Sequence, residues 1–163
     1  IKPKHLIVFR DFELFVGKER VGVGTSRWCL VDLANFAMLP SSVIFDGVKT
    51  EYNDFRSTTF NSWRIPRAEG GECTYSKIIS YSDYDHYNHA NNTKYADLLM
   101  DAFSVDDLRG KWVKQFRISY IKQCKCGEKV CFYRLKLDDG SWVVEGRAGD
   151  ELRVQFNVLF GEL

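Results

Sequence analysis

The second half of the chain alternates apolar and polar residues with a period of two, which is typical of strands that bury one face. The pattern predicts five strands, at 74–81, 111–124, 128–137, 142–147 and 152–160. Asp138-Asp139-Gly140 is a strong hairpin signal, and Gly149-Asp150 predicts a second turn. Lys125-Cys126-Gly127 is expected to join strands 111–124 and 128–137 through a tight turn.

One segment follows a helical period instead. Its apolar residues recur three and four positions apart, which predicts a helix of about a dozen residues; they are Tyr95, Ala96, Leu98, Leu99, Ala102 and Phe103. Before it lies the polar string 81–95, which contains two carboxylates, two histidines and three amides. Because such side chains compete with regular backbone pairing, this string is expected to be a loop that ends at the helix N-terminus.

The expected loop suits acyl chemistry. Unpaired backbone N–H groups and the positive end of the helix dipole converge at a helix N-terminus, where they could polarise a bound carbonyl beside Asp85 and His89. The alternative to this chemical role is a structural one, in which Asn91 or Asn92 caps the helix and the other polar groups form a solvated turn. For any single residue of the string the ordinary role is the commoner one.

The first part of the chain has a different organisation. Residues 5–16 and 20–32 are predicted to be two long strands joined by Gly17-Lys18, and no helix precedes them. Residues 61–72 contain Pro66 and Gly70-Gly71, which is typical of a linker. The chain is therefore expected to divide into residues 1–60, a linker at 61–72, and residues 73–163.

The composition of the chain narrows the range of functions that it could have. An apolar content of 45% with 15% aromatics supplies a core for one domain or for one and a part. The net charge of +1 is spread over mixed signs, which argues against nucleic acid as a partner. No apolar run approaches membrane-spanning length, and no signal peptide is visible, so the chain is expected to be cytoplasmic and to bind no membrane.

The cysteines fit a reducing compartment, as reduced and mostly buried thiols. They are Cys29, Cys73, Cys124, Cys126 and Cys131. Cys124-x-Cys126 has no second Cys or His pair at zinc spacing, so no metal site is expected.

The loop residues also follow a recognisable order, Asp-x-x-x-His-x-Asn-Asn-x-x-Tyr; they are Asp85, His89, Asn91, Asn92 and Tyr95. This order resembles the segment before the central helix of hotdog-fold thioesterases. With the flanking segments 81–85 and 95–101, it is most similar to the acyl-ACP thioesterases. The resemblance implies an α+β hotdog fold, in which a long helix is wrapped by a curved antiparallel β-sheet. Residues 73–163 would form one complete unit.

The resemblance extends to the first strands. Arg10-Asp11-Phe12-Glu13 and segment 28–32 (Trp-Cys-Leu-Val-Asp) resemble the closing strands of the first of two tandem units in that family. Residues 1–60 are then expected to be the C-terminal part of a truncated first hotdog unit. Two strands without their helix would leave an apolar face and an unpaired edge exposed.

The family also implies a catalytic set: an Asp, an Asn two residues on, a His two residues later, and a Glu-Cys pair on the following long strand. Asp85 and His89 match the Asp and the His. Tyr87 stands in place of the Asn, with Asn88 next to it, and Gln123 stands in place of the Glu, directly before Cys124. A Gln side chain cannot take a proton from water, so if Glu is the general base in the family, this chain must use another.

His89 is the expected base, because the ordinary pKa of histidine lies nearest neutral pH and Asp85 is close in sequence to orient it. Water guided by His89 and Gln123 would attack the thioester. The alternative nucleophile is Cys124, activated by His89, although a thiol beside an apolar strand is more often merely buried. Asn91, Asn92 and Tyr95 are expected to bind substrate.

The function expected from the resemblance is a thioester hydrolase that releases fatty acids from acyl carrier protein in fatty acid biosynthesis, without a cofactor. Acyl carrier protein is the expected partner, and a homodimer is compatible with the family. Two alternatives stay open. One is a hotdog hydrolase of acyl-CoA, and the other is a weakened hotdog unit that binds acyl carriers without turnover, which Tyr87 and Gln123 would favour.

Overall fold

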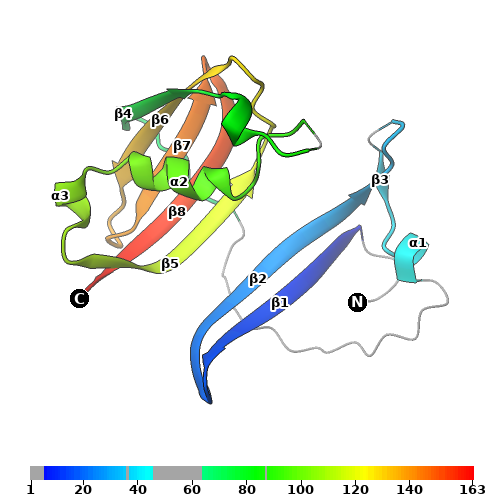
Figure 1. The fold of residues 1–163 in the computed structure, drawn as a ribbon, viewed down its shortest axis with the longest axis horizontal. Coiled ribbons are helices and arrows are strands. Elements are labelled where there is room, and N and C mark those ends of the chain that lie inside the picture. The colour runs from blue at the N-terminus through cyan, green and yellow to red at the C-terminus, as the bar shows by residue number, and fades with distance from the viewer. Residues whose placement is uncertain (1–5, 36, 46–63, 87) are drawn as a thin grey trace. The chain divides into compact units, whose positions relative to one another are not determined.

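The computed structural model of the chain describes residues 6–35, 37–45, 64–86 and 88–163 (Figure 1). The chain forms two compact units, Ile1–Asn61 and Ser62–Leu163.

The described part of the first unit is a hairpin with a small addition. Strand β1 (Ile7–Val16) pairs antiparallel with β2 (Glu19–Val31), as the sequence predicted. The turn between them contains Gly17, whose φ of +62° is readily adopted only by glycine. A short strand β3 (Met38–Leu39) pairs with the end of β2 and is followed by helix α1 (Ser42–Phe45); neither element was predicted.

The second unit is an antiparallel five-stranded sheet with a helix on one face (Figure 1). The strand order is β4-β6-β7-β8-β5. The strands are β4 (Glu72–Ile78), β5 (Lys111–Tyr120), β6 (Lys129–Lys136), β7 (Trp142–Ala148) and β8 (Glu151–Glu162). The period-two pattern therefore located all five strands, with ends displaced by up to four residues.

The turn predictions have mixed outcomes. Gly140 and Gly149 both have positive φ and join β6 to β7 and β7 to β8, as predicted. The prediction that Lys125-Cys126-Gly127 closes a hairpin is wrong, because β5 pairs with β8 and β6 pairs with β4 and β7. The chain turns at 125–128 but crosses the end of the sheet. Ile121 still donates to the carbonyl of Arg153 on β8, whereas Gly127 donates to that of Ile79 beyond β4.

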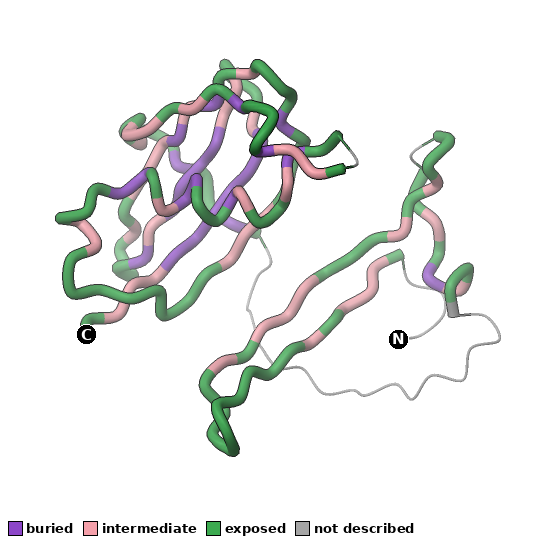
Figure 2. Tube along the Cα trace, viewed as in Figure 1, coloured by how far each residue is buried: buried purple, intermediate pink, exposed green. Residues whose placement is uncertain are grey.

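Helix α2 (Lys94–Asp101) is shorter than predicted, although its apolar side packs as expected. A second short helix, α3 (Val105–Leu108), follows, and Ser104 and Asp107 form a capping box at its start. Apolar side chains form the core between α2 and the sheet, and Figure 2 shows burial along the central strands. It includes Leu98, Leu99, Phe132, Val144, Val154, Phe156 and Val158.

Part of the predicted linker lies on the second unit; residues 61–63 fall outside the described chain. Ile65 and Ala68 are buried against Val143. Val143 alternates with Val144, which faces α2, so this segment covers the opposite face of the sheet.

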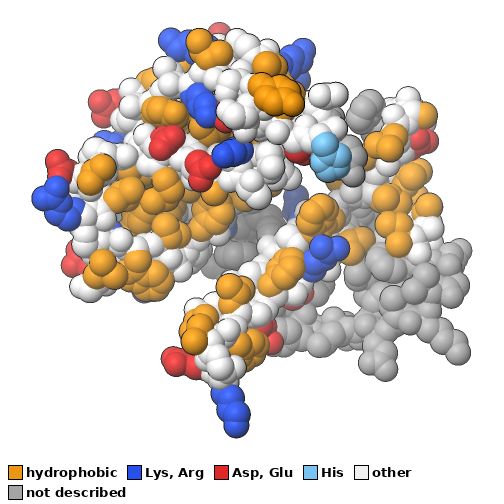
Figure 3. Space-filling view, in the orientation of Figure 1, with side chains coloured by type: hydrophobic (Ala, Val, Ile, Leu, Met, Phe, Trp, Pro, Cys, Tyr) orange, Lys and Arg blue, Asp and Glu red, His pale blue; other side chains and the backbone are white. Residues whose placement is uncertain are grey.

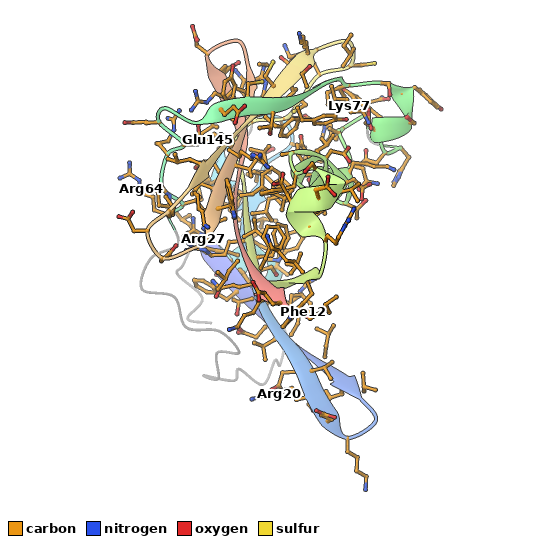
Figure 4. All side chains as sticks on the ribbon, turned by 90° about the vertical axis from the view of Figure 1, so that its left-hand side faces the viewer. Phe12, Arg20, Arg27, Arg64, Lys77 and Glu145 are labelled. Atoms are coloured by element: carbon orange, nitrogen blue, oxygen red, sulfur yellow. The ribbon has the colours of Figure 1, made fainter. Side chains whose placement is uncertain are left out.

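A buried carboxylate holds the segment there. Glu145 on β7 has an inaccessible side chain (Figure 4). Its Oε1 accepts from Arg67 Nε at 2.7 Å, from the Ala68 N–H at 3.1 Å and from Gln155 Nε2 at 2.9 Å. Its Oε2 accepts from Arg147.

Across the residues that the structure describes, helices are too short or too polar to cross a membrane.

Candidate active site

The polar string folds into a tight loop between the 3₁₀ turn η1 (Tyr81–Asp83) and helix α2. A bridge between Tyr84 and Ala90 closes the loop. Asp85 donates its N–H to the His89 carbonyl at 2.9 Å, and its Oδ1 accepts from the His89 N–H at 3.2 Å. Asn88 has a φ of +59°, a conformation that Asn tolerates better than most residues. Tyr87 lies outside the described residues.

A buried carboxylate anchors the start of the loop. Asp83 accepts from Lys77 Nζ at 2.6 Å and from the Ser80 N–H at 2.8 Å, and its carbonyl accepts from the Asn91 N–H at 2.8 Å. Figure 4 shows Lys77 on β4 beside η1. Burial alone would raise the pKa of Asp83, but the bonds from Lys77 and Ser80 outweigh it and lower the pKa. The loop is thus tied to the sheet at its base.

Asn91 forms a turn just before α2, whose N-cap residue is Thr93 rather than Asn91 or Asn92. Its Oδ1 accepts from the Thr93 N–H at 3.0 Å and from Thr93 Oγ1 at 2.9 Å, and its carbonyl accepts from the Lys94 N–H at 2.9 Å. This Asx turn sets the start of α2. The Asn91 Oδ1 already accepts two hydrogen bonds within the loop, and its contact with substrate stays a prediction.

An open pocket of about 220 Å³ lies at the N-terminus of α2. The loop and helix line one side of it and the end of β5 with its following residues lines the other. The lining residues are His89, Ala90, Asn92, Tyr95, Tyr120, Ile121, Lys122 and Gln123. The pocket therefore brings together His89 and Gln123, which are far apart in the sequence and both exposed to solvent.

Two tyrosines support this pocket. The rings of Tyr95 and Tyr120 meet edge to face, with centroids 5.4 Å apart. Tyr120 donates its hydroxyl to the Asn92 carbonyl at 3.3 Å, and Tyr95 Oη accepts from the Cys124 N–H at 3.4 Å. Burial, followed by the contact with Cys124, raises the pKa of Tyr95, so its hydroxyl stays protonated at neutral pH.

Cys124 lies behind the pocket and does not line it. Its side chain is buried, and its carbonyl accepts from the Tyr84 hydroxyl at 3.1 Å. Burial raises the pKa of the Cys124 thiol, and the nearby carboxylate of Glu128 adds to the rise, which outweighs the effect of Tyr95. Since the thiolate is the nucleophilic form, this environment disfavours Cys124 as a nucleophile.

Among the other predicted site residues, Asn92 lines the pocket, whereas Asp85 and Asn88 lie in the loop beside it. Asp85 holds the His89 backbone, and neither Asp85 nor Asn88 lines the pocket. Ile121 and Lys122 also line the pocket but were not among the predicted site residues. Their position directly before Gln123 on the same strand end is the signal that could have identified them.

The comparisons with known proteins define the class first. The structure is similar to a crystal structure of an acyl-ACP thioesterase from Bacteroides thetaiotaomicron, with a TM-score of 0.76 at 20% identity over 96% of this chain. It is also similar to the 12:0-ACP thioesterase from Umbellularia californica, with a TM-score of 0.84 at 12% identity over 100% of this chain. The chain has the hotdog-like fold of these thioesterases, and it spans 63% and 65% of their lengths.

The sequence comparison then matches part of the second unit to a family model. Residues 72–151 match the acyl-ACP thioesterase C-terminal domain, so the resemblance predicted from the loop is confirmed. No curated protein matches the chain significantly in sequence.

Proposed function

We propose that the chain hydrolyses acyl thioesters and releases fatty acids from acyl carrier protein. The observation that carries this proposal is the pocket at the start of α2, where His89 and Gln123 face the same space. The match of residues 72–151 to the acyl-ACP thioesterase C-terminal domain supports the same substrate class.

In the proposed mechanism the thioester carbonyl lies at the N-terminus of α2, where backbone N–H groups and the helix dipole stabilise the developing oxyanion. His89 takes a proton from water as the water oxygen attacks the carbonyl carbon. The C–S bond then breaks, and the imidazolium returns the proton to the leaving thiolate. The products are a carboxylic acid and the free thiol of the carrier.

Gln123 would orient the attacking water rather than deprotonate it, because an amide can donate and accept hydrogen bonds but has no basic site. Asp85 would act as a positioning residue, since its carboxylate accepts from the His89 N–H and holds that part of the loop. The buried thiol of Cys124 has no part in this mechanism.

One observation favours a second function, the binding of acyl carriers without turnover. The described pocket lining contains Gln123 at the place where the family resemblance implies a carboxylate base. If His89 alone cannot activate water, the pocket would still hold a thioester.

The test compares acyl-ACP and acyl-CoA with the same acyl chain, by release of free fatty acid and by binding to the unreacted thioester. We expect hydrolysis of acyl-ACP, with a lower kcat/KM for acyl-CoA. A preference for acyl-CoA would support the alternative hydrolase. Binding of acyl-ACP without release of fatty acid would support the carrier-binding function, and no binding or release with either thioester would contradict the proposal.

A further inference from the structure

The pocket wall that contains Gln123 lies outside the strands of the sheet. Strand β5 ends at Tyr120 and β6 begins at Lys129, so regular strand pairing does not fix the backbone between them. Gln123 is exposed, whereas the next residue, Cys124, is buried. The position of the Gln123 side chain therefore depends on what holds the backbone on either side of it.

The backbone before Gln123 is bonded to strand β8. Ile121 and Lys122 both donate their N–H groups to the carbonyl of Arg153, at 2.9 and 3.0 Å. Arg153 is buried, and its Nε donates to Glu128 Oε2 at 3.1 Å. Because Arg153 lies in a strand and its charged side chain is paired, the carbonyl that holds this part of the wall is itself fixed.

The backbone after Gln123 is bonded to the helix and to the loop that contains His89. Tyr95 on α2 accepts from the Cys124 N–H at 3.4 Å, and the Tyr84 hydroxyl donates to the Cys124 carbonyl at 3.1 Å. Gln123 therefore lies between two points of attachment. The first is the sheet, and the second includes Tyr84 of the loop.

Tyr84 is fixed within the loop by its own backbone. Its N–H donates to the Tyr81 carbonyl at 3.1 Å, and the residue forms the bridge with Ala90 that closes the loop. Ala90 follows His89 directly, and both line the pocket. The Tyr84 hydroxyl thus connects the base of this loop to Cys124, which is 40 residues away in the sequence.

A purely structural role is the simplest account of this contact. Tyr84 is partly buried against the core, and a tyrosine in such a place usually directs its hydroxyl to a hydrogen-bond partner. The acceptor that Tyr84 uses favours a further role. The Cys124 carbonyl lies one residue beyond Gln123, which lines the pocket together with His89.

We propose that Tyr84 is a positioning residue, which holds wall segment 121–124 so that the Gln123 amide faces His89 across the pocket. This inference rests on the proposed function, in which Gln123 orients the water that His89 deprotonates. The effect of Tyr84 on the reaction is then geometric, since a small displacement of a group that orients a reactant can lower the rate strongly.

The test is Tyr84→Phe, which removes the hydroxyl and keeps the ring. We expect kcat with acyl-ACP to fall about tenfold with little change in KM, because the wall shifts while the substrate still binds. Tyr75→Phe is the matched control. Tyr75 is also partly buried against this core, its ring centroid lies 5.7 Å from that of Phe132, and it is outside the pocket lining. The control should keep the native kcat.

A double-mutant cycle separates positioning from a general loss of stability. If Tyr84 acts through Gln123, its hydroxyl should matter only when the Gln123 amide is present. Tyr84→Phe should therefore change kcat by less than about twofold in the Gln123→Ala background. Equal losses of kcat in the native and Gln123→Ala backgrounds would overturn the proposal, and so would a native kcat in Tyr84→Phe.

Amide hydrogen exchange tests the contact without turnover. Tyr84→Phe should speed exchange in segment 121–124, because the wall loses one of its attachments, and Tyr75→Phe should not. If the native chain released no fatty acid, the proposed function would fail, and exchange would still show whether Tyr84 fixes the wall. Unchanged exchange of segment 121–124 in Tyr84→Phe would contradict this inference.

Discussion

His89 is the residue on which the proposed chemistry depends, because its side chain lines the pocket. We expect His89→Ala to lower kcat with acyl-ACP by about 10²–10⁴-fold, the usual effect of losing a general base. The matched control is His86→Ala, which changes the other histidine of the same loop, outside the pocket lining, and should keep most activity. Equal losses in the two variants, with a lowered Tm in both, would indicate a folding effect and remove the role of His89.

Gln123 is one of the two positions, with Tyr87, at which this chain departs from the acyl-ACP thioesterase pattern. In Gln123→Glu, a new negative charge enters the pocket and stabilises the imidazolium of His89. If His89 is the base, the ascending limb of the pH–rate profile should move to higher pH with little change in the maximal rate. A large gain in rate without that movement would instead assign the role of base to the carboxylate.

Substitution of Cys124 tests the alternative mechanism, in which the Cys124 thiol attacks the thioester. Because its thiol is buried behind the pocket, Cys124→Ala should retain most of the turnover of acyl-ACP. The measurement is kcat together with mass spectrometry of the enzyme quenched during turnover. An acyl group found on Cys124 in the native chain, with loss of turnover in the variant, would contradict activation of water.

At the scale of elements, Glu145 connects segment 64–68 to β7 through Arg67 and the Ala68 N–H. We expect Glu145→Gln to lower the free energy of unfolding by about 1–3 kcal/mol, because it leaves buried donors with a weaker acceptor. Urea unfolding measures this change. Asp106→Asn is the control, since it breaks the exposed pair with Arg109 and should cost little. Equal losses of unfolding free energy in the two variants would contradict a stabilising role for the buried Glu145 carboxylate.

The same carboxylate predicts a pH dependence of stability. Burial alone would raise the pKa of Glu145, but the bonds from Arg147, Ala68, Arg67 and Gln155 outweigh it and lower the pKa in the folded chain. A lowered folded pKa contributes stability that is present above the unfolded pKa and is lost as pH falls through the folded value. The difference in unfolding free energy between native chain and Glu145→Gln should therefore shrink as the pH falls below the ordinary Glu range. A difference that grew on acidification would contradict this sign.

At the scale of the whole molecule, the hairpin of the first unit exposes apolar side chains on both strands, and Figure 3 shows hydrophobic groups along it. Leu14 and Val16 are 57% and 69% exposed. Exposed apolar strands are predisposed to associate. We expect residues 1–163 to self-associate with concentration in sedimentation velocity. Leu14→Lys with Val16→Lys should reduce this, whereas Val105→Lys, an exposed apolar residue outside the hairpin, should not. A single monomer species at all concentrations would contradict the prediction.

The sequence by itself determined the local elements of this protein. Strand positions follow from the period-two pattern, and the turns at Gly140 and Gly149 follow from residues that tolerate positive φ. The loop before α2 follows from its polar side chains, and its order of residues led to the family that residues 72–151 match. These strands, turns and the loop depend on residues that are close together in the sequence, so the order of residues along the chain is enough to predict them.

Tertiary structure alone decided which distant segments meet. The alternation in β5 indicates a strand, but any strand with a matching apolar face could pair with it, and the fold selects β8 rather than β6. The same selection places Gln123 opposite His89, buries Cys124 behind the pocket and covers the sheet with segment 64–68. The physical reason is that strand pairing and burial depend on how whole apolar surfaces fit together. Those surfaces are made of residues far apart in the sequence, so a short stretch of sequence cannot predict the fit.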